Sequence, residues 1–248
     1  MNTVLKLYRT RRAEDRGVSL VEIAVVLLIL SIFVPLILGV LTSVQKQEVA
    51  VSSRDFASGE AQAISDVLSR QIHAAAIPTG QTAALVVAQA NVLQFFSALG
   101  YVNGPTEIKL YTTQSCPTCS TYNLDEQVTQ PGPSVGNGPV YTGGTATVTT
   151  GVIGTGVLPP TPSPSNDCPP GSGSFTPGIF EYINSPTSGQ ACLPLSGSPP
   201  ALTSTQLGQA EHLTVTITTV DPSRAKTTPT TTYTLQITLP NVDYYNGT

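Results

Sequence analysis

Tryptophan is absent from the sequence, and only 10% of the residues are charged. The chain instead contains 21 glycines and 21 prolines, and threonine and serine fill much of its second half. Such a composition produces a surface that is polar without being charged. It favours a protein that is exported and exposed to proteases over a cytosolic enzyme.

The sequence also lacks the motifs that mark common catalytic sites. No serine lies in a G-x-S-x-G elbow, and no glycine-rich phosphate loop follows a predicted strand. The two histidines, His73 and His212, are expected on an amphipathic helix and at the start of a strand, away from paired acids. We therefore predict no catalytic residues, no enzymatic activity and no cofactor.

Positive charge is concentrated at the N-terminus. Residues 1–17 hold five basic and two acidic residues, a net charge of +3, whereas residues 18–248 hold six basic and thirteen acidic residues, a net charge of −7. Because no cluster of Lys and Arg lies beyond residue 17, the pattern argues against nucleic-acid binding through phosphate contacts.

An uncharged and mostly apolar run extends from Ile23 to Gln45. At about 1.5 Å per residue, a helix of this length spans the hydrocarbon core of a bilayer. The positive-inside rule places the basic leader in the cytoplasm and the acidic part of the chain outside. We expect a single-pass protein of the cytoplasmic membrane with an extracytoplasmic globular domain.

The leader does not have the form of an ordinary secretory signal, because no A-x-A site follows the apolar run. The junction Arg16-Gly17-Val18-Ser19-Leu20-Val21-Glu22 resembles the cleavage and methylation motif of type IV pilins and type II secretion pseudopilins. The resemblance implies that a prepilin peptidase cuts after Gly17 and methylates the new amino terminus at Val18. An uncleaved signal anchor is the alternative interpretation.

Glu22 is the fifth residue of the mature chain in this interpretation. A carboxylate at the edge of hydrocarbon costs up to about 3 kcal/mol if it is drawn to the centre, so it normally has a partner. The resemblance implies that Glu22 meets the Val18 amine of a neighbouring subunit in the filament core. The expected partners are other pilin-like subunits, the prepilin peptidase, the cytoplasmic membrane and the assembly platform.

The helical pattern continues beyond the membrane run. Apolar residues recur at steps of three, four or seven, at Val49, Phe56, Ala57, Ile64, Leu68, Ile72 and Ala75. One helix over about residues 18–76 is predicted, ended by Pro78 and Gly80. The expected parts are a leader at 1–17, a transmembrane or filament-core helix at 18–45, its amphipathic half at 46–77 and a β domain at 78–248. Pro35 and Gly39 are expected to soften the apolar half.

Strand patterns follow the helix. Short apolar or alternating segments predict strands at 84–88, 92–97, 107–112, 178–183, 212–220 and 230–239. A region rich in Pro, Gly and Thr, at about 116–200, predicts mostly loop. The predicted fold class is α+β and pilin-like, with a long helix on an antiparallel sheet that carries a loop-rich insertion. The order of these segments resembles that of the J-type minor pseudopilins and related minor pilins.

Four cysteines, Cys116, Cys119, Cys168 and Cys192, lie on the side of the membrane where disulfides persist. We favour pairing Cys116 with Cys119, which closes a tight turn, and Cys168 with Cys192, which closes a Pro/Gly-rich loop. Cross-pairing of the two groups stays open. Zinc is not expected, because the spacing of Cys168 and Cys192 is not that of a second C-x-x-C.

Three functions fit these patterns to different degrees. A minor pilin or pseudopilin, whose chemistry is assembly, is favoured by the junction motif. A pilin-anchored surface adhesin that offers its Pro/Thr/Gly-rich loops to a ligand is the main alternative. A membrane-tethered thiol oxidoreductase is disfavoured, because the residues after Cys119 do not predict the helix that lowers the pKa of a reactive cysteine.

Overall fold

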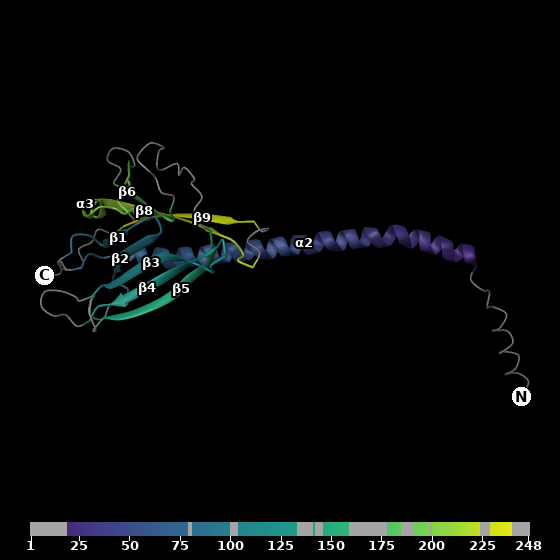
Figure 1. The fold of residues 1–248 in the computed structure, drawn as a ribbon, viewed down its shortest axis with the longest axis horizontal. Helices are drawn as coiled ribbons and strands as arrows, with labels where there is room; N and C mark the ends of the chain where they lie inside the picture. The colour runs from purple at the N-terminus through teal and green to yellow at the C-terminus, as the bar shows by residue number, and fades with distance from the viewer. Residues whose placement is uncertain are drawn as a thin grey trace, which may run out of the picture. The chain divides into compact units, whose positions relative to one another are not determined.

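The computed structural model describes most of the chain, namely residues 19–78, 81–99, 104–132, 141, 146–158, 178–184, 191–198, 200–223 and 229–239. The chain divides into two compact units, Met1–Val49 and Ala50–Thr248. One long helix, α2 at Leu20–His73, supplies residues to both units. The globular unit contains the sheet and the rest of the described elements (Figure 1).

The helix α2 confirms the single long helix that the sequence predicts, and Pro35 lies inside it. In its second half, the buried residues follow a helical stripe that begins at Ser53 and runs through Ala57, Ile64 and Leu68 to Ile72. Phe56, which the sequence pattern assigns to the apolar stripe, is 42% exposed. The small side chains of Ser53 and Ala57 bring the helix close to the sheet at these positions.

The described residues form a nine-stranded antiparallel sheet, with strands in the order β1-β2-β3-β4-β5-β8-β6-β7 and with β9 paired to β8. The strands are β1 Leu85–Ala88, β2 Val92–Ser97, β3 Thr106–Gln114, β4 Tyr122–Gln130, β5 Thr147–Val157, β6 Phe180–Asn184, β7 Ala191–Cys192, β8 Ala210–Thr219 and β9 Thr231–Thr238. A one-turn helix, α3 at Ser204–Leu207, precedes β8. The first five strands form an antiparallel meander, of which the sequence predicts the first three.

Strand β8 joins two parts of the sheet. Its end at Thr219 pairs with Val157 of β5, whereas its first half pairs with β6, up to the pair of Phe180 with Val215. Since β9 pairs along the opposite side of β8, β5 and β6 share one edge of this strand. The meander and the terminal strands therefore belong to one sheet.

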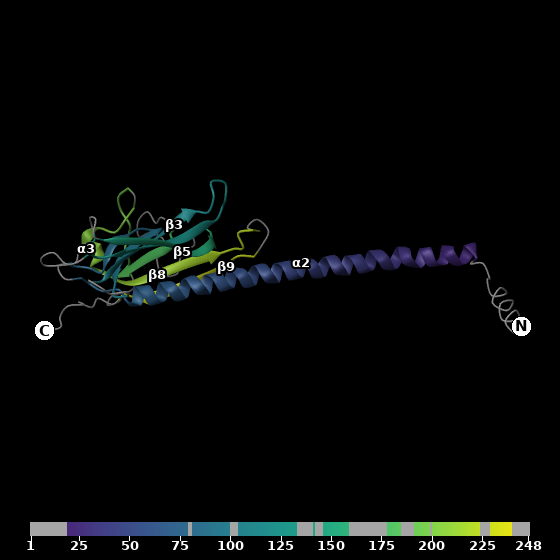
Figure 2. The ribbon, with the colours of Figure 1, turned by 90° about the horizontal axis from the view of Figure 1, so that it is seen from below.

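The second half of α2 lies along one face of this sheet (Figure 2). The Thr219 hydroxyl donates to the Ala57 carbonyl at 2.7 Å, and the Glu60 carboxylate accepts from the Thr155 backbone N–H at 2.6 Å. The core between α2 and the sheet is apolar. It contains Ile64, Leu68, Ile72, Leu93, Phe95, Leu110, Leu124, Leu213, Val215 and Ile217. Burial of these side chains, at about 25 cal/mol per Å² of apolar area, holds helix and sheet together.

Three strands correct the sequence analysis, because β4, β5 and the two-residue β7 lie inside the region predicted as mostly loop. Strand β4 carries Asp125 and Glu126 and has one fully buried apolar side chain, Leu124, so its alternation is weak. Strand β5 contains three glycines, at positions 151, 154 and 156, and a glycine inside a strand normally weakens it. Its Gly154 faces the helix, where a Cβ atom would lie 2.3 Å from the Ile64 side chain. The glycine there permits close packing of helix and strand.

Tyr182 of β6 ties the terminal strands to the start of the meander. It is 2% exposed, and its hydroxyl donates to the Gln89 carbonyl at 3.0 Å. Burial raises the pKa of Tyr182 well above its usual value of 10.0. The phenol is therefore neutral in the folded protein at a pH where the unfolded chain already loses this proton.

This difference predicts a loss of stability in alkali. Because the unfolded chain loses the proton first, the free energy of unfolding should fall as pH rises above about 10, by up to about 1.4 kcal/mol per pH unit for this one group. Tyr182→Phe should remove this part of the slope and lower stability at neutral pH by about 1–2 kcal/mol, since it leaves the Gln89 carbonyl without its donor. Urea unfolding between pH 8 and 11 measures both effects. Tyr233→Phe, at an exposed position of β9, is the control; equal slopes for the two variants would contradict the prediction.

Candidate functional site

The start of α2 is defined by Ser19. Its carbonyl accepts from the backbone N–H groups of Glu22 at 2.9 Å and Ile23 at 3.2 Å, and its hydroxyl accepts from the Val21 N–H at 3.4 Å. Ser19 is thus the N-cap, and Ser19-x-x-Glu22 has the spacing of a capping box. The sequence analysis does not identify this role of Ser19, although the S-x-x-E pattern before an apolar run is its signal.

Glu22 lies in the first turn of α2 and is exposed. A carboxylate is favoured there, because the unpaired N–H groups of the first turn carry partial positive charge. The predicted cleavage and methylation residues, Gly17 and Val18, lie outside the described residues. Since α2 begins at Leu20, the helix starts three residues after Gly17.

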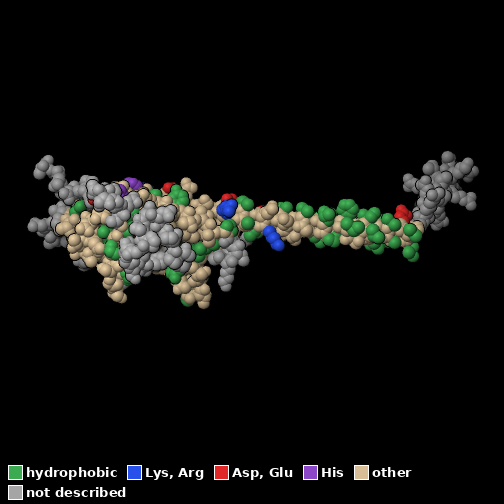
Figure 3. Space-filling model, turned by 90° about the horizontal axis from the view of Figure 1, so that it is seen from above, with side chains coloured by type: hydrophobic (Ala, Val, Ile, Leu, Met, Phe, Trp, Pro, Cys, Tyr) green, Lys and Arg blue, Asp and Glu red, His purple; other side chains and the backbone are tan. Residues whose placement is uncertain are grey.

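The N-terminal unit presents an apolar surface on all sides of α2. Every large hydrophobic side chain of the helix from Leu20 to Val44 is between 46% and 84% exposed, and such side chains cover this part of the helix in Figure 3. By length and composition, the helix is able to cross a membrane. A contiguous apolar surface of this size is not stable in water. The structure is thus consistent with a single-pass membrane protein.

Two hydroxyl groups within this apolar stretch are bonded inside the helix. The Ser31 hydroxyl donates to the Leu28 carbonyl at 2.7 Å, and the Thr42 hydroxyl donates to the Gly39 carbonyl at 3.0 Å. Because a hydroxyl without a partner is costly in hydrocarbon, these bonds suit a helix in lipid or in a filament core.

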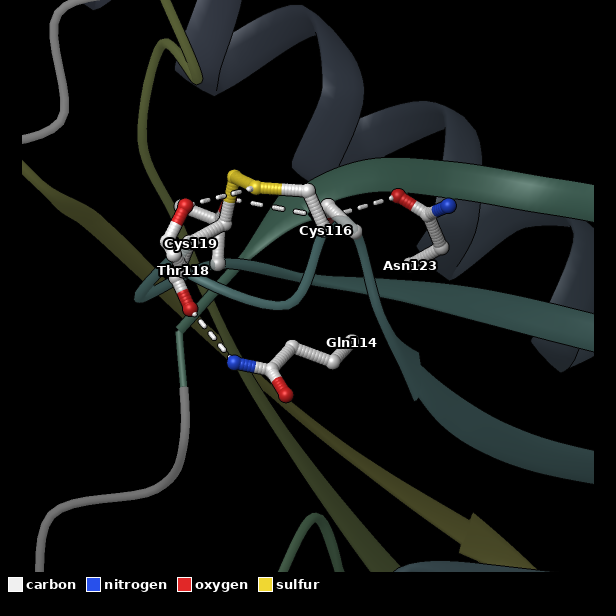
Figure 4. Close-up of a disulfide and its surroundings, with 7 residues drawn as sticks. Gln114, Cys116, Thr118, Cys119 and Asn123 are labelled. Carbon is white, nitrogen blue, oxygen red and sulfur yellow. Dashed lines mark hydrogen bonds between the residues drawn. A yellow bond between two sulfur atoms is a disulfide. The ribbon is translucent and has the colours of Figure 1, made fainter.

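Cys116 and Cys119 form a disulfide in the turn between β3 and β4, with their Cα atoms 5.0 Å apart (Figure 4). Hydrogen bonds support the turn: the Cys119 N–H donates to the Cys116 carbonyl at 3.0 Å, and the Gln114 side chain donates to the Cys119 carbonyl at 2.8 Å. The chain after Cys119 enters strand β4 at Tyr122. A helix N-terminus, which activates the cysteine of thiol oxidoreductases, does not follow this pair.

Cys192 is also disulfide-bonded, and Cys168, the partner predicted for it, lies outside the described residues. The sheet places the Cys116–Cys119 turn at the end of β3 and Cys192 in β7, at the far end of the strand order. Among the described cysteines, Cys192 therefore lies apart from the Cys116–Cys119 pair in the strand order of the sheet.

The Cys116–Cys119 disulfide and the predicted Cys168–Cys192 disulfide should differ in their effect on stability. Replacing Cys116 and Cys119 by serine opens a loop of four residues and should cost about 2 kcal/mol, whereas replacing Cys168 and Cys192 opens a loop of 25 residues and should cost about 3.5 kcal/mol by the same chain-entropy relation. The hydrogen bonds of the Cys116–Cys119 turn should preserve its conformation when the disulfide is absent. Urea unfolding under non-reducing conditions measures both costs. A larger loss from the first replacement would contradict this order.

The two histidines take part in local hydrogen bonds. His73 Nδ1 lies 2.7 Å from the Ser69 carbonyl oxygen one turn earlier in α2, and His212 Nδ1 lies 3.2 Å from the Thr238 hydroxyl on the neighbouring strand. Within the described ranges, no group of three or more His, Cys, Asp or Glu residues could hold a metal ion. These contacts are those of packing and surface residues.

Comparison of the chain with protein-family models, with characterised proteins and with solved structures finds no match. The resemblance to pilins thus rests on the residues of the junction and on the architecture. The architecture, a long apolar helix whose second half packs on an antiparallel sheet, is compatible with a pilin-like protein.

Proposed function

We propose that the protein is a minor pilin or pseudopilin, a structural subunit of a type IV pilus or of a type II secretion-like filament. The observation that carries the proposal is the position of Glu22. It lies in the first turn of a 54-residue helix, directly before an exposed apolar surface and five residues after Gly17. A carboxylate beside a membrane-spanning run is costly if it is drawn into the hydrocarbon, so its presence there favours a functional role.

In this proposal the precursor enters the cytoplasmic membrane with its basic leader inside and its sheet outside. A prepilin peptidase removes residues 1–17 and methylates Val18. The apolar half of α2 then leaves the lipid for the filament core, where other pilin-like helices cover its surface. Ser19 caps the helix, which begins at Leu20, three residues after Gly17 in the sequence.

Processing at Gly17 gives a direct test. Gly17→Val should leave the leader attached, since a branched side chain next to the cut bond hinders the peptidase, and the protein should be heavier than the wild type by residues 1–17. The intact mass of the protein from membranes measures this, and the wild type should begin at Val18 with one added methyl group. Gly39→Val is the matched control, because a Cβ at Gly39 meets nothing within 4 Å and processing should be normal. A wild-type protein that keeps its leader would refute the proposal.

A further inference from the structure

A pocket of about 290 Å³ lies in the globular unit, where the end of α2 meets β3 and β4. Its apolar lining includes Leu99, Ile108 and Val128, and its polar lining includes Gln71 and Glu126. We name it the Gln71–Glu126 pocket. Leu99 is 36% exposed, and Val128 is half-buried, so the apolar side of the pocket is open to the solvent.

The hydrogen bonding on the polar side of the pocket is incomplete. Gln71 is 6% exposed, and its Nε2 donates to Glu126 Oε1 at 2.5 Å. The other end of the same amide, Gln71 Oε1, is buried without a hydrogen-bond partner among the described residues. A buried acceptor without a donor costs about 1–3 kcal/mol. The half-buried Glu126 carboxylate is bonded here by a neutral donor, so it retains its capacity to bind a cation.

These features together define the occupant that fits. It needs a positively charged donor for Glu126 and Gln71 Oε1, and an aliphatic stem to cover Leu99, Ile108 and Val128. A lysine side chain has both, because its ammonium group carries three donors and its methylene groups pack on apolar surface. The planar fork of arginine fits less well, because it prefers both oxygens of a carboxylate and Gln71 already binds one. Arg70 lines the rim, but it is exposed, and water and salt screen its charge.

We propose that the Gln71–Glu126 pocket receives a lysine side chain from a neighbouring subunit. The neighbour follows from the proposed function, whereas recognition of an alkylammonium group is a property of the pocket itself. A small movement of the Gln71 amide brings Oε1 to the incoming ammonium. The ammonium then bonds to Glu126 and to Gln71, and its stem covers the open apolar side.

The first experiment uses the full chain in detergent micelles at pH 7, with the methyl groups of Ile, Leu and Val labelled for NMR. Titration with n-butylammonium chloride should shift the methyl signals of Leu99, Ile108 and Val128 saturably, and n-butanol and sodium butyrate should not. Glu126→Gln should weaken binding at least tenfold. The matched control is Asp125→Asn, which removes the same charge from the adjacent residue of β4. The Asp125 side chain lies on the other face of the sheet, so this variant should bind butylammonium like the wild type.

The methyl spectra without butylammonium show whether each variant is folded. Equal shifts with n-butanol, equal weakening in the two variants, or no response at the three methyl groups would each overturn the proposal.

The second experiment examines the neighbour in membranes from cells that assemble the protein. A water-soluble carbodiimide should join Glu126 by an amide bond to a lysine of another subunit, found by mass spectrometry of the cross-linked peptides and lost in Glu126→Gln. If filaments contain the protein and Glu126 is not joined to any lysine, the pocket has no such role, and the proposed function stands. If the protein binds butylammonium but enters no filament, the proposed function fails and the recognition stands.

Discussion

Glu22→Ala should leave the protein in the membrane and remove it from the filament. Membrane insertion depends on the uncharged run Ile23–Gln45 and on the basic leader, and neither changes in this variant. Assembly, in the proposed function, brings the Val18 amine of one subunit to the Glu22 carboxylate of another. Without the carboxylate, the amine is an unpaired charge in an apolar core, at a cost of about 3–5 kcal/mol. Incorporation should therefore fall by at least about a hundredfold.

The amounts of the protein in the membrane fraction and in the sheared filament fraction measure this effect. Glu48→Ala is the matched control, because Glu48 is an exposed carboxylate of the same helix beyond the apolar run, and its loss should change incorporation little. Glu22→Ala should also keep its normal processed mass. Filaments that contain the Glu22→Ala variant at the wild-type level would show that Glu22 does not have the assembly role.

Strong periodicity accounts for the parts of the fold that the sequence predicts well. The sequence predicts a helix over about 18–76, and α2 lies at Leu20–His73. It predicts a strand at 92–97, and β2 lies at Val92–Ser97. The terminal strands alternate between apolar and threonine side chains, and the structure buries Leu213, Val215 and Ile217 as expected. In these segments, the local pattern and the tertiary packing agree.

Strands β4 and β5 could not be predicted in this way, because tertiary contacts decide them. Strand β4 is stabilised by pairing with β3 from Tyr122 to Thr129. Contacts between residues distant in the sequence, such as that of Glu126 with Gln71, also stabilise it. Strand β5 needs glycine where the helix approaches, as at Gly154. A strand selected for close approach loses the alternation that makes a strand visible in a sequence.

The candidate functional residues also differ in how well the sequence predicts them. Glu22 is recognisable because a carboxylate beside an apolar run contradicts the local pattern, and the residues around it form a motif. The Gln71–Glu126 pocket has no such signal, since its residues come from α2, β3 and β4 and have ordinary neighbours in the sequence. Only the packing of the helix on the sheet reveals that the two side chains meet.

Gly156→Ala should strongly destabilise the sheet. Gly156 has φ +67°, and a Cβ atom there would lie 2.2 Å from the Val220 carbonyl oxygen. An alanine in this conformation costs about 1–2 kcal/mol. The displaced backbone would also weaken the bonds that join β5 to β8, from Val220 N–H to the Gly156 carbonyl at 2.9 Å and from Leu158 N–H to the Thr218 carbonyl at 2.8 Å, at about 1 kcal/mol each.

The expected loss in the free energy of unfolding is therefore about 3–4 kcal/mol, the sum of these terms. Gly151→Ala, on the same strand, is the matched control: a Cβ at Gly151 meets nothing within 4 Å, so this variant should be as stable as the wild type or gain up to about 1 kcal/mol. Since the chain lacks tryptophan, urea unfolding is followed by tyrosine fluorescence and circular dichroism. Equal stability of the two variants would mean that the junction of β5 with β8 tolerates a side chain, and that the meander and the terminal strands are less firmly joined than their pairing indicates.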